Sequence, residues 1–250
     1  MKGTLSRTIS DINETPGLSS TGSVSNLTLA TSWLTTCTSA HSACSSPSAS
    51  TPLPTRVIDV ISDPPMLIPS ASFKLRESVP YATLSHRWGR QPIITTTLAT
   101  LATREKGVPM ASLPRTFRDA AIITRKMNVK YLWIDSLCII QDSKADWEAE
   151  AAKMGDYYRQ SLFTISAAGA ENGSVGCSMP RDPRLVRPCG LDLNFEGGGG
   201  EREASMNFKA HVRPRDDIGP WWRRTYSPLD RRGWVMQERI LAPRTLLFEF

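Results

Sequence analysis

The stretch LDRRGWVMQERIL, residues 229–241, places an acidic side chain within a pattern that is typical of a helix. Glu238 follows Trp234 by four positions, so the two side chains are expected to share a helical face. A carboxylate beside an apolar flank has a raised pKa, and it can serve as a general acid, a general base or a stabiliser of positive charge. The structural alternative is an ion pair with Arg231, Arg232 or a neighbouring arginine, and the spacing alone favours that alternative.

A second group of candidate residues follows two runs that resemble β-strands. The run YATLSHRWG contains Ser85, His86, Arg87 and Trp88 near its end, and Asp135 interrupts the apolar run YLWIDSLCII. Burying the charge of an aspartate costs several kcal/mol unless the carboxylate is paired, although it can also cap the next loop. An arginine offers a planar fork that matches phosphate, whereas a single histidine is more often structural.

Three further residues have types that bind metals. Cys37, His41 and Cys44 form the pattern C-x3-H-x2-C, which supplies three zinc ligands. A structural zinc site normally has four ligands, and Cys177 and Cys189 lie too far along the chain to be assigned as the fourth. We therefore expect a packed helix or hairpin at this element, without a tightly held zinc ion or another tightly bound cofactor.

The elements that must position these residues alternate between strands and helices. RVIDVI, YATLS, YLWIDSLCII, SLFTISAAG and RTLLFEF have the composition of strands, whereas LPRTFRDAAIITRKM has apolar residues at helical spacing. Ser143 and Asp146 resemble the capping box of another helix. This alternation predicts an α/β fold with an open, mainly parallel sheet flanked by helices. Ligands in such folds bind beyond the carboxyl ends of the strands, where the second group of candidates lies.

Composition divides the chain into three parts. Residues 1–30 are rich in Ser and Thr with few large apolar groups, which predicts a disordered tail. Residues 31–55 hold the W-L-C-H-C element and a Ser/Pro-rich linker, and residues 56–250 form the main domain. Within that domain, the glycines and prolines of residues 171–228 predict a long irregular insertion. Because the sequence stops inside the apolar run TLLFEF, we expect a domain that is shortened at its C-terminus.

Charge and hydropathy exclude several classes of protein. The net charge of +6 arises from 30 basic and 24 acidic residues that are scattered along the chain, and no DNA-binding motif is recognisable, which argues against nucleic-acid binding. No apolar run approaches the roughly 20 residues that a membrane span needs, and the N-terminus lacks the apolar core of a secretory signal. The odd number of cysteines, five, favours reduced thiols. These features predict a cytoplasmic protein.

Four blocks together resemble the HET (heterokaryon incompatibility) domain family of filamentous fungi. They are YATLSHRWG, LPRTFRDAAIITRKMNVKYLWIDSLCIIQD, DWEAEAAKMGDYYRQSLFTISAA and LDRRGWVMQERILAPRTLLF, and they follow the lead-in WL-x2-C-x3-H-x2-C. The resemblance implies an effector of programmed cell death that acts when genetically unlike hyphae fuse. It also implies contacts with other incompatibility proteins or self-association.

HET domains are in turn similar to TIR (Toll/interleukin receptor) domains, which implies a TIR-like, flavodoxin-like sheet. Some TIR domains hydrolyse NAD at its nicotinamide glycosidic bond. Their Trp-x3-Glu pattern matches Trp234 and Glu238, although Val235 stands where TIR domains often have Cys. The resemblance therefore makes Glu238 the catalytic candidate.

The same resemblance implies that NAD is a substrate of this chain. The strand end Ser85-His86-Arg87 is similar to a TIR strand end with Ser, Tyr and Arg, with His86 in place of the aromatic residue. Arg87 would contact pyrophosphate, and a tryptophan would stack on a flat ring. The candidate NAD contacts are Ser85, His86, Arg87, Trp88, Asp135 and Trp234. The alternative is a non-enzymatic signalling module that kills through protein–protein contacts.

Overall fold

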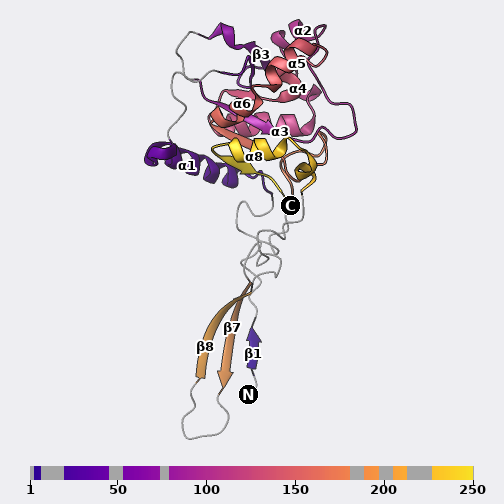
Figure 1. Ribbon diagram of the computed structural model, residues 1–250. Helices are drawn as coiled ribbons and strands as arrows, with labels where there is room; N and C mark the ends of the chain where they lie inside the picture. Colours follow the sequence, from indigo (N-terminus) through magenta and orange to yellow (C-terminus); the bar gives the residue numbers. More distant parts are fainter. Residues whose placement is uncertain are drawn as a thin grey trace.

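A six-stranded sheet forms the centre of the protein in the computed structural model (Figure 1). The structure describes residues 3–6, 20–44, 53–73, 79–180, 189–196, 205–212 and 227–249. The strand order is β3-β2-β5-β4-β6-β9. The strands are β2 (Arg56–Asp59), β3 (Met66–Pro69), β4 (Tyr81–Ser85), β5 (Tyr131–Trp133), β6 (Phe163–Ser166) and β9 (Thr245–Leu247).

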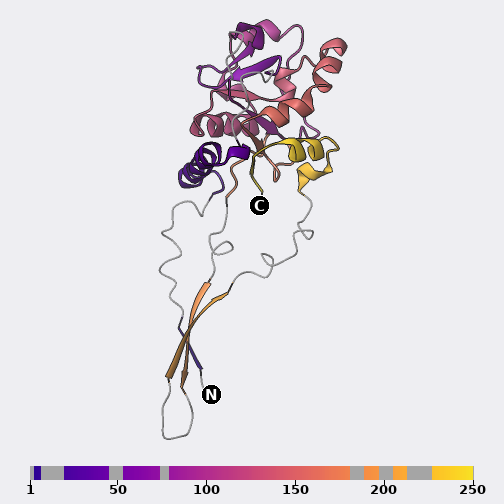
Figure 2. The same ribbon diagram turned by 60° about the vertical axis from the view of Figure 1, so that its left-hand side comes forward.

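Strands β5, β4, β6 and β9 are parallel neighbours, and β2 and β3 extend the sheet with antiparallel pairings. Helices surround this sheet in Figures 1 and 2. The predicted α/β fold with an open, mainly parallel sheet flanked by helices is therefore confirmed. The α-helices are α1 (Val24–Ala40), α2 (Leu101–Lys106), α3 (Arg115–Lys126), α4 (Asp135–Cys138), α5 (Lys144–Ala151), α6 (Met154–Gln160) and α8 (Val235–Leu241). Short 3-10 helices are η1 (Ser42–Cys44), η2 (Ser70–Ser72), η3 (Met110–Ser112) and η6 (Pro228–Arg231).

The core lies between the sheet and its helices. Leu84 of β4, Trp133 of β5 and Ile165 of β6 are fully buried, and Phe117 of α3 packs into the same apolar cluster. Helix α5 begins after Ser143, whose side chain accepts a hydrogen bond from the backbone N–H of Asp146, as the capping pattern predicts. No helix in the described part of the chain is both long and apolar enough to cross a membrane.

The run YLWIDSLCII differs from its predicted form as one long strand. Strand β5 ends at Trp133, and α4 begins at Asp135. The Asp135 carboxylate accepts a hydrogen bond from the backbone N–H of Ser136 at 2.7 Å, which satisfies one of the free N–H groups at a helix start. An apolar run alone does not distinguish a strand from a buried helical turn. In this run, Asp135 marks the position where the helix begins.

Two further predictions differ from the structure: the extent of the N-terminal tail and the irregular form of the insertion. Helix α1 begins at Val24, so residues 24–30 of the predicted tail are helical, with Leu27 and Ala30 buried. The predicted irregular insertion contains strands β7 (Cys189–Glu196) and β8 (Ser205–Val212), which form an antiparallel three-stranded sheet with β1 (Gly3–Ser6). The alternation in LDLNFE is typical of a strand, and the neighbouring glycines and prolines obscured it. The remainder of the predicted tail, residues 1–2 and 7–19, lies outside the described residues.

Candidate functional site

The order of the parallel strands defines where a ligand would bind. The chain passes from β4 to β5 on one side and then crosses to β6 on the other side of β4. Ligands in open α/β sheets bind at such a reversal, beyond the carboxyl ends of the strands. Here Ser85 at the end of β4 is in register with Ser166 at the end of β6, so the loops that follow these two residues border the switch point.

Glu238 of α8 reaches this switch point. Its side chain is 2% exposed, and the hydroxyl of Ser85 donates a hydrogen bond to its Oε2. This hydrogen bond joins residues that are 153 positions apart, and it connects the end of β4 to helix α8. Burial raises the pKa of Glu238, whereas the Arg232 charge and the Ser85 hydrogen bond oppose that rise.

Arg232 lies between two carboxylates. Its Nη1 is 3.9 Å from Glu238 Oε1, and its Nη2 is 3.7 Å from Asp135 Oδ2. Nη1 also donates a hydrogen bond to the backbone carbonyl of His86. The ion pair with Arg232, one of the structural alternatives for Glu238, is therefore present, and the Ser85 hydroxyl makes a closer contact. We call Ser85, His86, Asp135, Arg232 and Glu238 the carboxylate cluster.

His86 contributes a buried imidazole to this cluster. The side chain is 1% exposed, and its ring packs edge-on against Phe117 at a centroid distance of 4.9 Å. Neither ring nitrogen has a hydrogen-bond partner among the described residues, and Nε2 is 3.8 Å from Asp135 Oδ1. Burial lowers the pKa of His86, so the neutral imidazole is favoured.

The predicted aromatic residues occupy different environments. Trp88 is half-buried, and its indole Nε1 donates a hydrogen bond to Asp135 Oδ2 at 3.0 Å. Trp234 is the N-cap residue of α8, and its side chain is 50% exposed. The Glu238 side chain is buried, so it and the exposed Trp234 side chain lie in different environments, although their spacing predicts a shared helical face.

A polar pocket is lined by residues that adjoin the carboxylate cluster along the chain, because Arg87 follows His86 and Arg231 precedes Arg232. It has a volume of about 380 Å³, and it lies between the loop after β4 and the loop after β6. We call it the switch-point pocket, and its lining residues are Arg87, Gly89, Arg90, Gln91, Glu171, Asn172 and Arg231. Three guanidinium groups beside one carboxylate suit an anionic ligand such as a phosphate ester. Of the predicted site residues, Arg87 lines this pocket, whereas Ser85, His86, Asp135 and Glu238 belong to the carboxylate cluster.

Gly89 permits the close approach of the two loops. Its φ is +79°, and a Cβ at this position would lie 2.5 Å from Asn172 Cβ. Both the positive φ and the close contact disfavour other residues. A second hollow, of about 20 Å³, is lined mainly by apolar core side chains, and it offers few groups for chemistry.

Two contributors to the site were not assigned a role in it from the sequence. Arg232 stood only as one of several possible ion-pair partners of Glu238, yet it contacts both carboxylates. Tyr158 of α6 is buried, and its hydroxyl donates a hydrogen bond to the carbonyl of Leu84 at 3.3 Å. The negative charges of Glu238 and Asp135 add to burial in raising the pKa of Tyr158. No local sequence signal predicts this position, since it depends on how α6 packs on β4.

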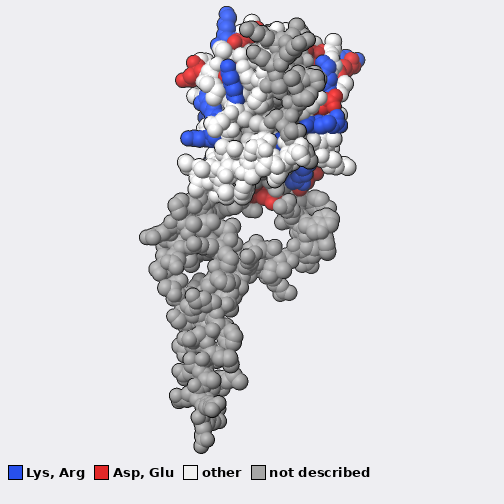
Figure 3. All heavy atoms as spheres, turned by 90° about the vertical axis from the view of Figure 1, so that its left-hand side faces the viewer, with Lys and Arg blue, Asp and Glu red and all other residues white. Residues whose placement is uncertain are grey.

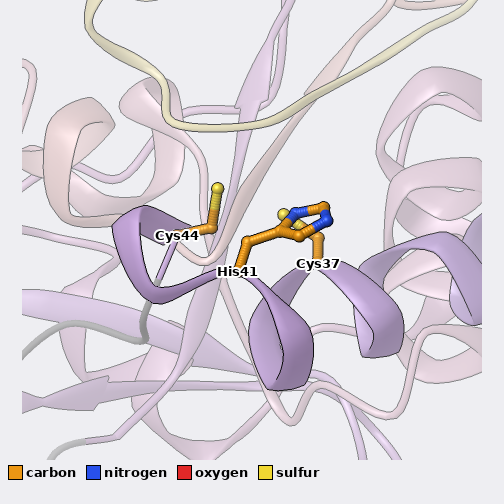
Figure 4. Close-up of side chains that lie close together, drawn as sticks. All are labelled: Cys37, His41 and Cys44. Atoms are coloured by element: carbon orange, nitrogen blue, oxygen red, sulfur yellow. The ribbon is translucent and has the colours of Figure 1, made fainter.

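Residues with metal-binding side chains gather at the end of α1. The ligand atoms of Cys37, His41 and Cys44 all lie within 4.8 Å of one another (Figure 4). Arg244 Nε donates a hydrogen bond to Cys37 Sγ at 3.2 Å, and this contact, together with the neighbouring His41 and Cys44, lowers the pKa of Cys37 to about 7. The expectation that this element holds no tightly bound zinc stays a prediction.

Comparison with protein families identifies the domain that carries the site. The family model described as heterokaryon incompatibility protein (HET) matches residues 81–238, more than half of the 250 residues. The chain belongs to the HET family. Comparison with curated proteins and with solved structures gave no significant match.

The matched region of this HET protein begins with β4 and ends at Glu238. It therefore contains the whole carboxylate cluster and the switch-point pocket, whereas Cys37, His41 and Cys44 precede it. The predicted membership of the HET family is confirmed. The likeness to TIR domains and the role of NAD stay predictions.

Proposed function

We propose that this HET domain is an effector of programmed cell death between unlike fungal cells, and that it acts by hydrolysing NAD. The observation that carries the proposal is the buried Glu238 carboxylate at the sheet switch point, beside a pocket that contains Arg87 and Arg231. Other incompatibility proteins, or further copies of this chain, would act with it. The domain would act in the cytoplasm.

The reaction breaks the bond between C1′ of the ribose and the ring nitrogen of nicotinamide. Nicotinamide leaves with the bonding electron pair, water adds to C1′, and the water proton passes to solvent. The transition state has the character of an oxocarbenium ion, so a nearby carboxylate lowers its energy. Glu238 would supply this charge, and the switch-point pocket would hold the pyrophosphate through Arg87 and Arg231.

Burial of Glu238 sets a requirement for this reaction. The side chain is 2% exposed, and Arg232 and Asp135 of the same cluster are also mostly buried. Substrate must therefore displace part of this cover to bring C1′ to the carboxylate. The unbonded nitrogens of His86 and the neighbouring Asp135 provide polar atoms for the ribose hydroxyls of a ligand that enters.

Nicotinamide release tests the proposal directly. Purified protein is incubated with NAD, and free nicotinamide is measured by chromatography while light scattering records the oligomeric state. Arg87→Gln and Arg231→Gln should each raise KM by about tenfold or more, because a charge-assisted hydrogen bond to phosphate is worth about 1.5–3 kcal/mol. Lys144→Gln is the control, because the Lys144 side chain is 89% exposed on α5. Absence of nicotinamide release by both monomeric and assembled protein would contradict the enzymatic proposal.

A non-enzymatic assembly module is the second candidate, and the exposed face of α8 favours it. Met236 and Ile240 lie four residues apart on this helix and are 71% and 68% exposed. Helix α1 contains no charged residue, and Figure 3 shows an uncharged area at the lower edge of the coloured part of the molecule. Trp33 of α1 is 64% exposed. Exposed apolar groups of this kind often mark protein contacts.

The double substitution Met236→Gln/Ile240→Gln separates the two candidates. If the chain kills by assembly alone, this change should abolish both self-association and killing, while NAD in the cells stays constant. If the chain hydrolyses NAD as an autonomous enzyme, nicotinamide release should persist in the variant. Lys144→Gln is the control, because its side chain is 89% exposed on α5, a helix that is not part of either exposed apolar surface.

A further inference from the structure

We propose that Cys37, His41 and Cys44 form a reversible Zn²⁺ site whose fourth position is open to water or to an incoming ligand. These residues precede the matched HET region, and the site does not depend on the proposed NAD chemistry. Zinc sites with three protein ligands, Cys₂His among them, keep the fourth position for water or a substrate. Such a site is compatible with the expectation that no zinc is tightly held.

The local backbone brings the three residues together. Cys37 lies in the last turn of α1, and His41 is the C-cap residue four positions later, with φ −105° and ψ 109°. The chain then turns into η1, where the backbone N–H of Cys44 donates a hydrogen bond to the carbonyl of His41 at 2.9 Å. Figure 4 shows the resulting arrangement, in which two side chains come from the helix end and the third comes from the turn after it.

The ligand atoms are close to the geometry that zinc requires. Tetrahedral zinc with Zn–S bonds of about 2.3 Å and Zn–N bonds of about 2.0 Å places its ligand atoms about 3.5–3.8 Å apart. The three atoms here lie within 4.8 Å of one another, so the largest contraction needed is about 1 Å. Rotation of exposed or half-buried side chains supplies a movement of this size without a change of the backbone.

The surroundings favour a dication at this position. Helix α1 has no basic residue in its last turn, so the partial negative charge of its C-terminus is not neutralised from within the helix. Arg244 donates hydrogen bonds to Cys37 Sγ and to the carbonyl of Cys44, contacts that orient a metal ligand and its turn. Two thiolates balance the charge of Zn²⁺, so the added repulsion from the guanidinium is small.

Binding of zinc would stabilise the packing of α1 against the edge of the main sheet, through the contacts of Arg244. Arg244 immediately precedes the edge strand β9, and its Nη1 donates a hydrogen bond to the carbonyl of Leu162 at 3.0 Å. Helix α1 is rich in Ser and Thr, which are weak helix formers, and its buried residues are Leu27 and Ala30. Because so few residues of α1 are buried, the free energy of zinc binding at its C-terminus would stabilise the folded helix.

Metal titration of the purified, reduced chain tests the site. After removal of metal, Co²⁺ is added and thiolate-to-cobalt charge-transfer absorption is recorded, and Zn²⁺ is then added to displace the cobalt. We expect one equivalent of Zn²⁺ to bind in the low micromolar range. Cys37→Ser, His41→Ala and Cys44→Ser should each lower the affinity by at least about 100-fold, because each removes one of three protein ligands.

Two further variants keep the test decisive. Cys177→Ser removes a buried thiol that is not part of the cluster, so its cobalt spectrum should match that of the parent protein. His41→Cys retains a zinc ligand and should bind, whereas His41→Ala should not, and circular dichroism confirms that both variants are folded. Lack of saturable binding below about 100 µM by the reduced parent, or an unchanged cobalt spectrum in Cys37→Ser/Cys44→Ser, would overturn the proposal.

Discussion

Substitution of Glu238 by Gln is the most direct perturbation of the proposed chemistry. The glutamine keeps the size of the side chain, and its amide oxygen can still accept the hydrogen bond that Ser85 donates to Glu238. What it removes is the negative charge at a position that is 2% exposed. The substitution therefore separates a charge that acts on a transition state from a side chain that fills space.

The expected effect on folding is small because two opposing contributions are lost together. At an effective dielectric constant of about 20, the attraction between Arg232 and Glu238 across 3.9 Å is about 4 kcal/mol before desolvation. Burial of the carboxylate opposes this attraction by a similar amount. A net change of about 1 kcal/mol corresponds to a shift in Tm of about 2–4 °C for a domain of this size.

The effect on NAD cleavage should be much larger. Loss of one group that stabilises transition-state charge lowers the rate by about 100-fold or more, which corresponds to about 2.7 kcal/mol in activation free energy. The parent and Glu238→Gln proteins are expressed at matched levels, and nicotinamide release, cellular NAD and viability are measured. Glu148→Gln is the matched control, because it removes a carboxylate that is 60% exposed on α5.

Two results would refute this reasoning. Undiminished NAD cleavage by Glu238→Gln would remove the residue from the mechanism. A large fall in Tm, with normal activity in the protein that remains folded, would assign Glu238 to a structural ion pair. If the parent protein kills cells without lowering NAD, the assembly mechanism is favoured.

Further predictions concern stability and its dependence on pH. Because the folded-state pKa of Glu238 is raised above 4.5, its contribution to stability is present below pH 4.5 and is lost as pH rises through the folded value; urea unfolding of the parent should show this loss relative to Glu238→Gln. The pKa of His86 is lowered from 6.5, so stability should fall as pH drops below 6.5 toward the folded value, and His86→Phe should flatten this part of the profile. Gly89→Ala should destabilise the protein by more than about 1 kcal/mol, because φ is +79° and the added Cβ meets Asn172; an unchanged Tm would contradict the close packing of the two loops. Arg56→Met should cost about 2 kcal/mol or more in the free energy of unfolding, because it leaves Asp146 and the carbonyl of Cys138 without their contacts at 2.6 and 2.7 Å, whereas Lys144→Met at an exposed pair should cost less than about 0.5 kcal/mol.

The type of fold was predictable from the sequence because most of its elements carry local signals. The buried runs that form β4 and β6 and the apolar spacing of α3 are periodic patterns, and such patterns depend on neighbouring residues alone. The same locality explains where the sequence misled. Asp135 ends a strand inside a continuous apolar run, and β7 and β8 lie between glycine-rich and proline-rich segments.

The family resemblance also came from the sequence, since its motifs are long and ordered, and the match over residues 81–238 confirms it. Those motifs named Ser85 and Glu238 as candidates, but spacing alone did not separate a catalytic carboxylate from an ion-pair partner. The order in which strands assemble is a long-range property of the sheet, so the switch point between β4 and β6 was not accessible from local patterns.

Only the tertiary structure brought together groups that are distant along the chain. It placed the Ser85 hydroxyl on the Glu238 carboxylate, put Arg232 between two acids and set Arg244 beside Cys37. The contacts of Ser85 with Glu238, of Arg232 with Asp135 and of Arg244 with Cys37 each join segments that the chain separates by about a hundred residues or more. Their geometry follows from the packing of α8 and β9 on the sheet. Local periodicity contains no information about such distances, because a side chain's partner depends on every element that folds between the two residues.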